Sequence, residues 1–587
     1  MRQAALRLQA ALFLVAAGSA TAGNLLDSKH NLSVSGSGSI RAQSESQTCL
    51  FCHTPHNARP AVPLWNHRST VATYSTYSSS TLTVSGSVPQ PGGASKLCLS
   101  CHDGTIALGQ TVNDGLIAML NTGAGGTMPV GSSNLGTDLT DDHPVSFRPP
   151  VSNPEILQPA PGDAVALDPA GELQCTSCHD PHTEDRDPVS RRFLVKSNQA
   201  SGLCVTCHRP ALWDTNPSAH RSSNATYTAA KGAHTGYTTV RDNGCESCHR
   251  PHSGREPERL LKFVEEDTCG RCHDGSVAGK NVAAEFNKIY SHPTYARTPS
   301  VHDAAESPVN PSATVPEVNP GAARHAECAD CHNSHAAYAA SATAPRVPGS
   351  LSGVWGIDSS GARVDPATTE YQICYKCHAD SANKPQESGQ PDPPYTRRRI
   401  VQFNIRLELD PANPSHHAVE APGRNPDVPS LLPPYTTASI IYCKDCHNNN
   451  AGPGAGGTGP RGPHGSTYAH LLERNLNVGA NNTGQNYATM YALCFKCHSQ
   501  TSIMGDQTFK EHQKHIEGED SSCTVCHDPH GVSATQGNAT ENSHLINFDV
   551  SVVTPNSAGL LRFEDRGSRH GACYLRCHGD NHNPRTY

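Results

Sequence analysis

A Cys-x-x-Cys-His pattern recurs along the whole of this 587-residue sequence and constrains its fold more than any other feature. Residues 175–179, for example, are Cys-Thr-Ser-Cys-His, with two residues between the cysteines and a histidine directly after them. The pattern occurs eleven times, and residues 573–578, Cys-Tyr-Leu-Arg-Cys-His, form a twelfth copy with one extra residue between the cysteines. Together the twelve copies use all 24 cysteines.

This pattern is the attachment sequence of a c-type haem, in which two thiols form thioethers with the porphyrin and the adjacent imidazole ligates the iron. Zinc sites and short-loop disulfides also use paired cysteines, but neither requires a histidine after every pair. We therefore expect about twelve haem c groups per chain. The Cys/Cys/His sets, numbered here as motifs 1 to 12, are Cys49/Cys52/His53, Cys98/Cys101/His102, Cys175/Cys178/His179, Cys204/Cys207/His208, Cys245/Cys248/His249, Cys269/Cys272/His273, Cys328/Cys331/His332, Cys374/Cys377/His378, Cys443/Cys446/His447, Cys494/Cys497/His498, Cys523/Cys526/His527 and Cys573/Cys577/His578.

Histidine is abundant enough to supply a second ligand to every iron, because 34 histidines leave 22 beyond the twelve proximal ones. Methionine is scarce, with only Met119, Met128, Met490 and Met504 after the start residue, so His/Met ligation can be at most a minority pattern. In five motifs a further histidine stands three residues after the proximal one, and we expect it to ligate an adjacent haem; these are His56, His182, His252, His335 and His530.

The other distal candidates lie between the motifs and are His30, His67, His143, His234, His292, His417, His464, His515 and His544, with His302, His325, His512 and His582 in reserve. The fourteen leading candidates outnumber the twelve irons, so at least two of them have another role. A surface histidine, or one that bonds a haem propionate, is the alternative for each.

Residues 1–22 are typical of a secretory signal, with Arg2 and Arg7 before an apolar run and Ala20-Thr-Ala22 as the cleavage site. An uncleaved anchor is the alternative, but the apolar run is shorter than the roughly 20 residues that a membrane span requires. No later segment could span a bilayer. Because c-type haems are attached outside the cytoplasm, we expect an exported protein that is periplasmic, outer-membrane-associated or extracellular.

Composition argues for a core made of cofactor. Only 35% of residues are hydrophobic and 5% aromatic, and 49 Gly and 45 Pro would leave an ordinary domain with a poor core. We expect an irregular, loop-rich fold with short helices at the haem motifs, few strands and a haem-filled core, and an apo chain that is largely unfolded. The formal charge of -8, made more negative by haem propionates, argues against nucleic acid as a partner.

Proline-rich stretches at residues 149–169 and 307–320 suggest three regions after the signal. These are an N-terminal region with haems 1–2 (23–150), a middle region with haems 3–7 (151–340) and a C-terminal region with haems 8–12 (341–587). Locally, we expect helices at 368–378 and 487–498, and strands at 403–409 and 546–550. The arginines at 397–399 form a solvated face or pair with haem propionates.

The sequence resembles the multihaem c-type cytochromes with doubled CXXCH motifs of metal-reducing and related anaerobic bacteria. The resemblance covers nearly the whole chain after residue 22 and rests on residues 49–56, 64–66, 98–104, 142–144, 245–252, 462–465 and 523–530. It implies packed, bis-histidine haems that pass electrons across the cell envelope, and for some relatives a polymer outside the cell. The final CxxxCH departs from the usual motif and leaves the attachment of haem 12 open.

We expect an electron carrier, not an enzyme, with other redox proteins or extracellular electron acceptors as partners. The first alternative is a reductase of nitrite or hydroxylamine type, which needs one open iron. A CxxCK attachment would favour it, but all twelve motifs carry histidine. The second alternative is a subunit of an extracellular haem filament, a homopolymer that the loop-rich composition allows.

Overall fold

The computed structural model describes residues 25–58, 64–79, 81–84, 86–214, 218–294, 326–380, 397–480 and 486–587. The expected signal segment, the proline-rich stretch at 307–320, His302 and His325 lie outside these ranges. The chain forms two compact units. Unit 1 comprises Met1–Thr215 and His220–Thr268, and unit 2 comprises Asn216–Ala219 and Cys269–Tyr587. The division into regions at residues 150 and 340 stays a prediction.

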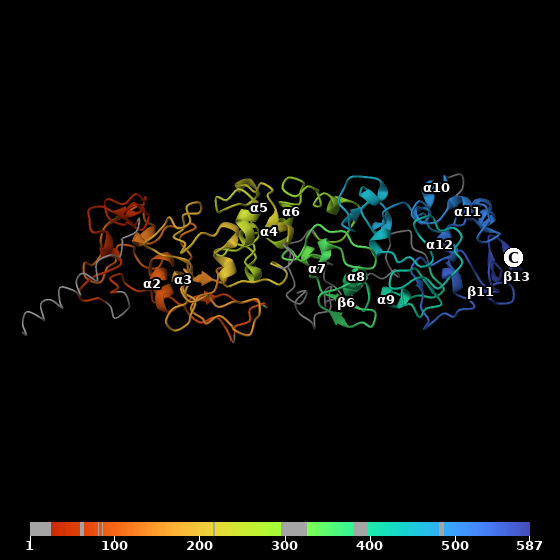
Figure 1. Ribbon diagram of the computed structural model, residues 1–587, viewed down its shortest axis with the longest axis horizontal. Helices are drawn as coiled ribbons and strands as arrows, with labels where there is room; N and C mark the ends of the chain where they lie inside the picture. Colours follow the sequence, from red (N-terminus) through yellow and green to blue (C-terminus); the bar gives the residue numbers. More distant parts are fainter. Residues whose placement is uncertain are drawn as a thin grey trace, which may run out of the picture. The chain divides into compact units, whose positions relative to one another are not determined.

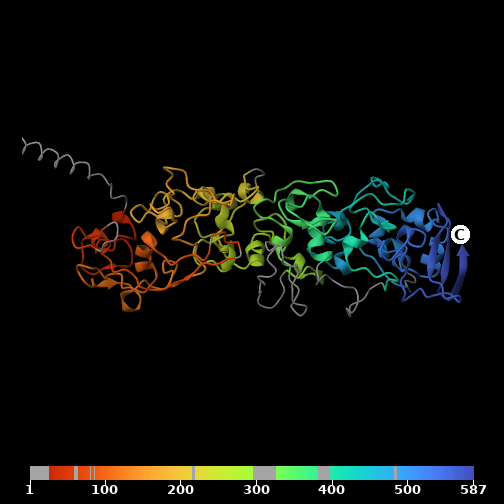
Figure 2. The same cartoon turned by 90° about the horizontal axis from the view of Figure 1, so that it is seen from below.

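Loops dominate the fold, as expected from the high glycine and proline content (Figures 1 and 2). Most described helices are single turns, and the two longest, α2 and α8, end on the proximal histidines of motifs 2 and 8. The expected irregular fold with short helices at the haem motifs is therefore confirmed. The described α-helices are α2 Gly93–His102, α3 Cys175–Cys178, α4 Ala219–Ser222, α5 Val240–Asn243, α6 Glu265–Gly270, α7 Cys328–Cys331, α8 Glu370–His378, α9 Ile405–Glu408, α10 Tyr487–Met490, α11 Gln500–Met504 and α12 Cys523–Cys526.

Strands are short and few. Five two-residue pairs occur among the described residues: β1 Arg41–Ala42 with β3 Met119–Leu120, β2 Ser75–Thr76 with β4 Asp138–Leu139, β5 Tyr290–Ser291 with β9 Gly465–Ser466, β6 Gly356–Ile357 with β7 Arg363–Val364, and β8 Ser415–His416 with β10 Gly531–Val532. The C-terminal segment forms a three-stranded antiparallel sheet in the order β11 Arg562–Asp565, β12 Gly571–Cys577, β13 Asp580–Thr586 (Figure 1).

The strand expected at 403–409 is wrong. This segment contains α9, whose N-cap Asn404 accepts a hydrogen bond from the Arg406 amide. Ile405 and Leu409 then lie one turn apart and pack with Tyr375 and Val419. Alternating apolar residues at 403, 405, 407 and 409 also include an i, i+4 pair, so the same pattern permits a helical turn.

Other local expectations are met in part. The helix expected at 368–378 is present as α8, whereas the one expected at 487–498 is divided into α10 and a 3-10 turn at Cys494–Lys496. The strand expected at 546–550 is irregular, with isolated bridges only. Arg398 is not on a solvated face, because its side chain is 9% exposed and donates to the Thr524 and Asn547 carbonyls.

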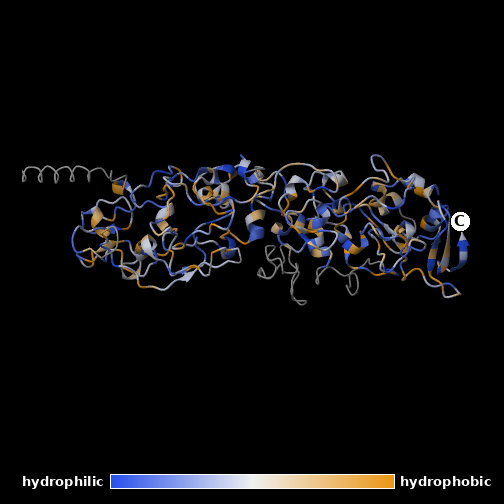
Figure 3. Cartoon of the chain, turned by 60° about the horizontal axis from the view of Figure 1, so that its bottom comes forward, coloured by the Kyte–Doolittle hydropathy of each residue, from blue (hydrophilic) through white to orange (hydrophobic). Residues whose placement is uncertain are grey.

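Buried apolar side chains form separate small clusters. The largest in the described part of the chain joins Val525, Ile546, Phe548, Val553, Phe563, Leu575 and Cys577, and the others have three or four buried members each. Hydrophobic residues are accordingly scattered among hydrophilic ones along the ribbon (Figure 3). Clusters of this size bury too little apolar surface to stabilise a fold of more than 500 residues. Most of the interior must therefore be filled by a group other than protein side chains.

Candidate haem-binding sites

All eleven CxxCH segments fold into one tight turn. In motif 3 the His179 amide donates to the Cys175 carbonyl over 2.9 Å, and the equivalent bond of 2.8–3.0 Å occurs in motifs 1, 4, 5, 6, 7, 9, 10 and 11. Motifs 2 and 8 form the last turns of α2 and α8. A single turn keeps two thiols and an imidazole close together, as attachment to one porphyrin requires.

Nine proximal histidines face a second histidine at a nearly constant spacing of 5.6–6.4 Å between ring centroids. An imidazole nitrogen binds a transition-metal ion at about 2 Å, so two imidazoles on opposite sides of one ion have centroids roughly 6 Å apart. The residues present therefore fit a six-coordinate haem iron. The pairs are His53–His182, His102–His30, His179–His252, His208–His143, His332–His464, His378–His292, His447–His530, His527–His512 and His578–His515.

A rule with a period of two motifs describes these pairs. In motifs 3, 5 and 11 the histidine after the motif faces the proximal histidine two motifs earlier, as His182 faces His53. Motif 9 has Asn450 at this position, and His464 faces the motif 7 histidine instead. Motifs 2, 4, 8 and 12 pair with a histidine from a preceding connecting segment, as His102 does with His30. Motif 11 departs from the two-motif rule, because His527 faces His512, and His578 of motif 12 also faces His582. For motif 10, His417 lies close enough to His498 to lower its pKa further.

Hydrogen bonds at Nδ1 orient these rings. Among the proximal histidines, His102, His179 and His447 bond the carbonyl oxygens of Ser133, Arg192 and His470 over 2.7–2.9 Å. The facing histidines do the same, as at His30 to the Pro181 carbonyl and His292 to the Pro463 carbonyl. Such a bond fixes the tautomer and leaves Nε2 as the nitrogen available to a metal.

Burial keeps the paired imidazoles neutral. Desolvation lowers the pKa of His143 to about 4 and that of His464 to about 3. It also lowers the pKa of His179, His447 and His527 to about 4. A neutral imidazole is the form that ligates iron, so these groups are ready for ligation at neutral pH.

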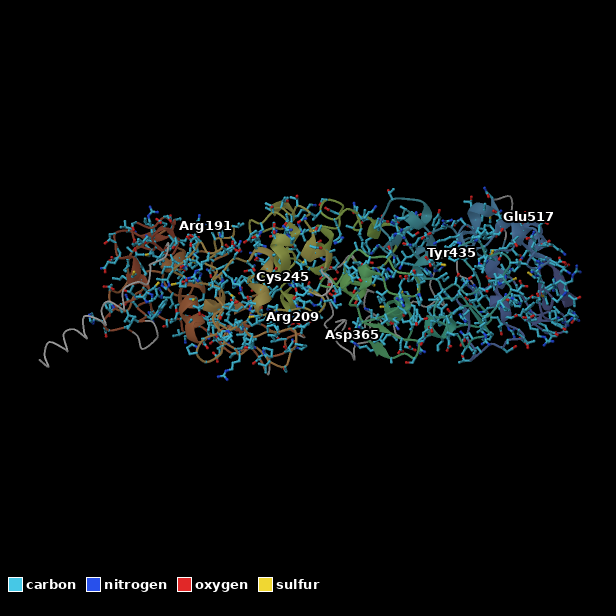
Figure 4. The ribbon with its side chains drawn as sticks, viewed as in Figure 1. Arg191, Arg209, Cys245, Asp365, Tyr435 and Glu517 are labelled. Atoms are coloured by element: carbon cyan, nitrogen blue, oxygen red, sulfur yellow. The ribbon has the colours of Figure 1, made fainter. Side chains whose placement is uncertain are left out.

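Within each unit, consecutive motifs meet through their cysteines, and the contacts alternate. First cysteines meet in Cys98–Cys175, Cys204–Cys245, Cys269–Cys328, Cys374–Cys443 and Cys494–Cys523. Second cysteines lie near one another in Cys52–Cys101, Cys178–Cys207, Cys331–Cys377 and Cys446–Cys497. Cys245, labelled in Figure 4, is the sulfur through which motif 5 contacts motif 4. Unit 1 thus holds motifs 1 to 5 in sequence order, and unit 2 holds motifs 6 to 12.

Motif 5 is the last motif of unit 1 and has the ordinary turn. The amides of Cys248 and His249 donate to the Cys245 carbonyl over 3.1 and 2.8 Å, and the Cys248 carbonyl accepts from the Lys262 amide over 2.9 Å. His249 Nδ1 bonds the Arg259 carbonyl over 2.9 Å, and burial lowers the pKa of its imidazole. The residues of this motif are therefore arranged like those of the other CxxCH motifs.

Motif 6 begins unit 2 with the same turn. The amides of Cys272 and His273 donate to the Cys269 carbonyl over 3.2 and 3.0 Å. The His273 carbonyl accepts from the Val282 amide over 2.7 Å, so the segment after the motif folds back onto it. This geometry suits the predicted roles of Cys272 as the second thioether and His273 as the proximal ligand.

Second-ligand assignments are predictions at every motif, motifs 5 and 6 included. His273 lies near enough to His464 to contribute to its lowered pKa, but the ring that His464 faces is His332 of motif 7. Ring geometry favours two histidine ligands at nine motifs, and the electrostatic effect of His417 on His498 favours them at motif 10. Mostly bis-histidine ligation and haem attachment at the paired cysteines stay predictions at all twelve motifs.

Motif 12 has a different backbone from the others. Cys573 and Cys577 lie on β12, with a register irregularity between Cys573 and Leu575, and His578 follows the strand at φ 41°. Residues four apart span roughly 13 Å in an extended strand but about 6 Å in a helix. Attachment of both thiols to one haem therefore requires the irregular part of β12 to bend. His578 nevertheless faces His515, and the motif lies beside Cys526 of motif 11.

We expect all twelve motifs to carry haem, and motif 12 provides the most sensitive test. Substituting serine for both Cys573 and Cys577 should lower the intact mass of the holo-protein by one haem. A matched double substitution at Cys523 and Cys526 should do the same in an ordinary motif. An unchanged mass for the motif 12 variant would mean that this motif holds no haem.

Several sequence candidates face other groups. The buried His67 bonds the Arg68 and Ala107 carbonyls, His234 bonds Glu246 at 3.0 Å, and His544 lies 3.3 Å from Asp565. His56 is exposed. The His335 amide donates to the Asn333 side chain, and His335 stays a predicted distal ligand. Conversely, His512, a reserve candidate, faces His527, and spacing alone gave no reason to prefer it over His544. The ligand assignments remain proposals.

A second observation fits bound porphyrin. The Trp65 indole is 9% exposed, and its Nε1 has no hydrogen-bond partner within the described ranges. Trp65 lies beside His53 with ring centroids 6.4 Å apart. A buried indole N–H normally finds an acceptor, so a propionate on the motif 1 haem is a suitable partner for this donor.

Comparison with known families agrees with the geometry. A family model described as the doubled CXXCH motif matches residues 168–212 and 238–278, which contain motifs 3–4 and 5–6. These motifs indicate a multihaem c-type cytochrome. Such proteins bind haem c covalently, transfer electrons to redox partners and receive their haems outside the cytoplasm. No curated protein matches the sequence significantly. Within the described ranges, none of the helices combines the length and apolar character needed to cross a bilayer.

Proposed function

We propose that this chain conducts electrons through twelve c-type haems, which follow one another in sequence order within each unit and are mostly bis-histidine. The alternating contacts between consecutive motifs are the observation that carries the proposal. Since both thiols of a motif attach to one porphyrin, sulfurs in contact hold neighbouring porphyrins edge to edge. Each haem, when attached, takes up and releases one electron.

The paired histidines also favour transfer over catalysis. An iron with two imidazole ligands has no position for a substrate, whereas a reductase needs an open one. Nine pairs and the His417–His498 approach account for ten of the twelve motifs. We propose an exported location, with small redox proteins or extracellular acceptors as partners.

The test is electron paramagnetic resonance of the oxidised holo-protein, followed by carbon monoxide addition to the reduced form. We expect twelve haems per chain by mass, only low-spin iron and no carbon monoxide adduct. A high-spin signal from the intact protein, with binding of carbon monoxide, would contradict a purely conducting role and identify a reactive iron.

A further inference from the structure

Asp142 is a buried carboxylate bonded to a paired histidine. Its Oδ1 lies 2.9 Å from His252 Nδ1 and accepts a weaker bond from the Ser253 amide at 3.3 Å. The Asp142 side chain is 5% exposed, and its Oδ2 has no hydrogen-bond partner among the described residues. His252 is the residue that faces His179 of motif 3.

The groups around Asp142, other than His252, do little to offset its negative charge. The neighbouring Asp141 is an acid whose pKa is raised by burial and by Asp142. The charge of Arg250 lowers the pKa of Asp141, and burial keeps the His143 imidazole neutral, so that it offers no positive charge to Asp142. A buried charge is costly unless it is paired with an opposite one. The positive charge best placed to pair with Asp142 is that of the metal centre to which His252 belongs.

Among the other facing histidines, four lack this arrangement, whereas His530 in unit 2 shares it. His30, His143 and His292 bond backbone carbonyls, which carry only a partial charge. Asp180 lies 3.3 Å from His182, but it also pairs with Arg186 at 2.9 Å, and the His182 side chain is 52% exposed. In unit 2, Glu408 is 8% exposed in its side chain and lies 3.3 Å from His530, which faces His447.

We propose that Asp142 lowers the reduction potential of the motif 3 haem by placing a buried negative charge on its distal ligand, His252. The inference rests on the proposed function, because it needs a haem at motif 3 with His252 as a ligand. A carboxylate on Nδ1 increases the basicity of the imidazole and stabilises the more positive, oxidised metal centre. Glu408 has the same effect on the motif 9 haem through His530.

Asp142 also has a structural role that must be separated from its charge. The His143 amide donates to the Pro251 carbonyl and the Gly254 amide to the Asp141 carbonyl, so residues 141–143 are tied to 251–254. The substitution Asp142→Asn keeps an acceptor oxygen for His252 and Ser253 and removes only the charge. It therefore tests the electrostatic effect at fixed geometry.

The experiment is a redox titration of the full-length holo-protein carrying Asp142→Asn. The titration is monitored by absorbance and by the low-spin signals in electron paramagnetic resonance spectra. We expect one haem's share of the amplitude to shift to higher potential, with an increase of about tenfold in its reduction equilibrium constant, or about 59 mV for one electron. The integrated intensity of the low-spin iron signal in the fully oxidised variant should equal that of the unmodified protein. Asp180→Asn is the matched control and should shift its haem much less, because Arg186 and solvent already compensate Asp180.

An unchanged titration of Asp142→Asn with all haems low-spin would overturn the proposal. If that variant does not assemble, Glu408→Gln gives the same test in unit 2, and an unchanged curve there would equally overturn it. Failure of the proposed function has a different signature, visible in the unmodified protein: a haem missing from the motif 3 peptide, or high-spin iron.

Discussion

Replacing His182 with alanine will convert one haem per chain from low-spin to high-spin and allow it to bind carbon monoxide. The His182 ring faces the motif 1 histidine His53 at 6.1 Å, so its loss leaves that iron without a sixth ligand. The charged side chains beside it, Asp180 and Arg186, pair with each other over 2.9 Å and do not replace an imidazole. Electron paramagnetic resonance of the oxidised variant measures the high-spin iron, and absorbance of the reduced variant measures carbon monoxide binding.

His56 is the matched control, because it occupies the same position after motif 1 as His182 does after motif 3. No motif lies two places before motif 1, and the His56 ring is exposed. His56→Ala should therefore leave every haem low-spin and unreactive to carbon monoxide. A high-spin haem in this variant, or none in His182→Ala, would contradict the rule that connects each such histidine to the motif two places earlier.

Preventing haem attachment will abolish the native fold. The described apolar clusters have at most seven buried members, and many buried positions are polar, such as Asn66, Gln174 and Asn449. With no porphyrin, the chain cannot bury enough apolar surface to offset the conformational entropy that folding removes. We expect the haem-free chain to lose nearly all of its protease resistance and its near-ultraviolet circular dichroism.

The comparison needs the same sequence in both forms, produced with and without the haem-attachment machinery. Limited proteolysis of the two samples under identical conditions then isolates the contribution of the cofactor. A haem-free chain that keeps a native dichroism spectrum and resists proteolysis would show that the small side-chain clusters are sufficient. In that case the cofactor would add redox chemistry to a fold that forms without it.

Sequence alone was sufficient for the features that depend on local spacing. CxxCH predicts a single turn wherever it occurs, and the low apolar content predicts loops; both agree with the structure. Features that depend on contacts between distant segments were not predictable. The pairing of His143 with His208, or of His464 with His332, requires residues far apart in the sequence to meet.

The failures have identifiable physical causes. The apolar alternation around Leu407 is compatible with a strand, but Asn404 caps a helical turn and two of the apolar residues pack one turn apart. The sheet β11–β13 was not expected, because β13 is polar and contains Pro584, which is unfavourable in a strand interior. Asp142 and Glu408 gave no signal as partners of histidines, since acidic residues are common on solvated surfaces.

The alternation of cysteine contacts limits how a chain of this kind can change its length. A motif that meets its predecessor through its second cysteine meets its successor through its first, so a single inserted motif would bring unlike faces together. The smallest insertion or deletion that restores matching faces is two motifs. The histidine after motifs 3, 5 and 11 faces the proximal histidine two motifs earlier, which is the same period. A chain of this kind can therefore gain or lose motifs in pairs without separating these facing histidines.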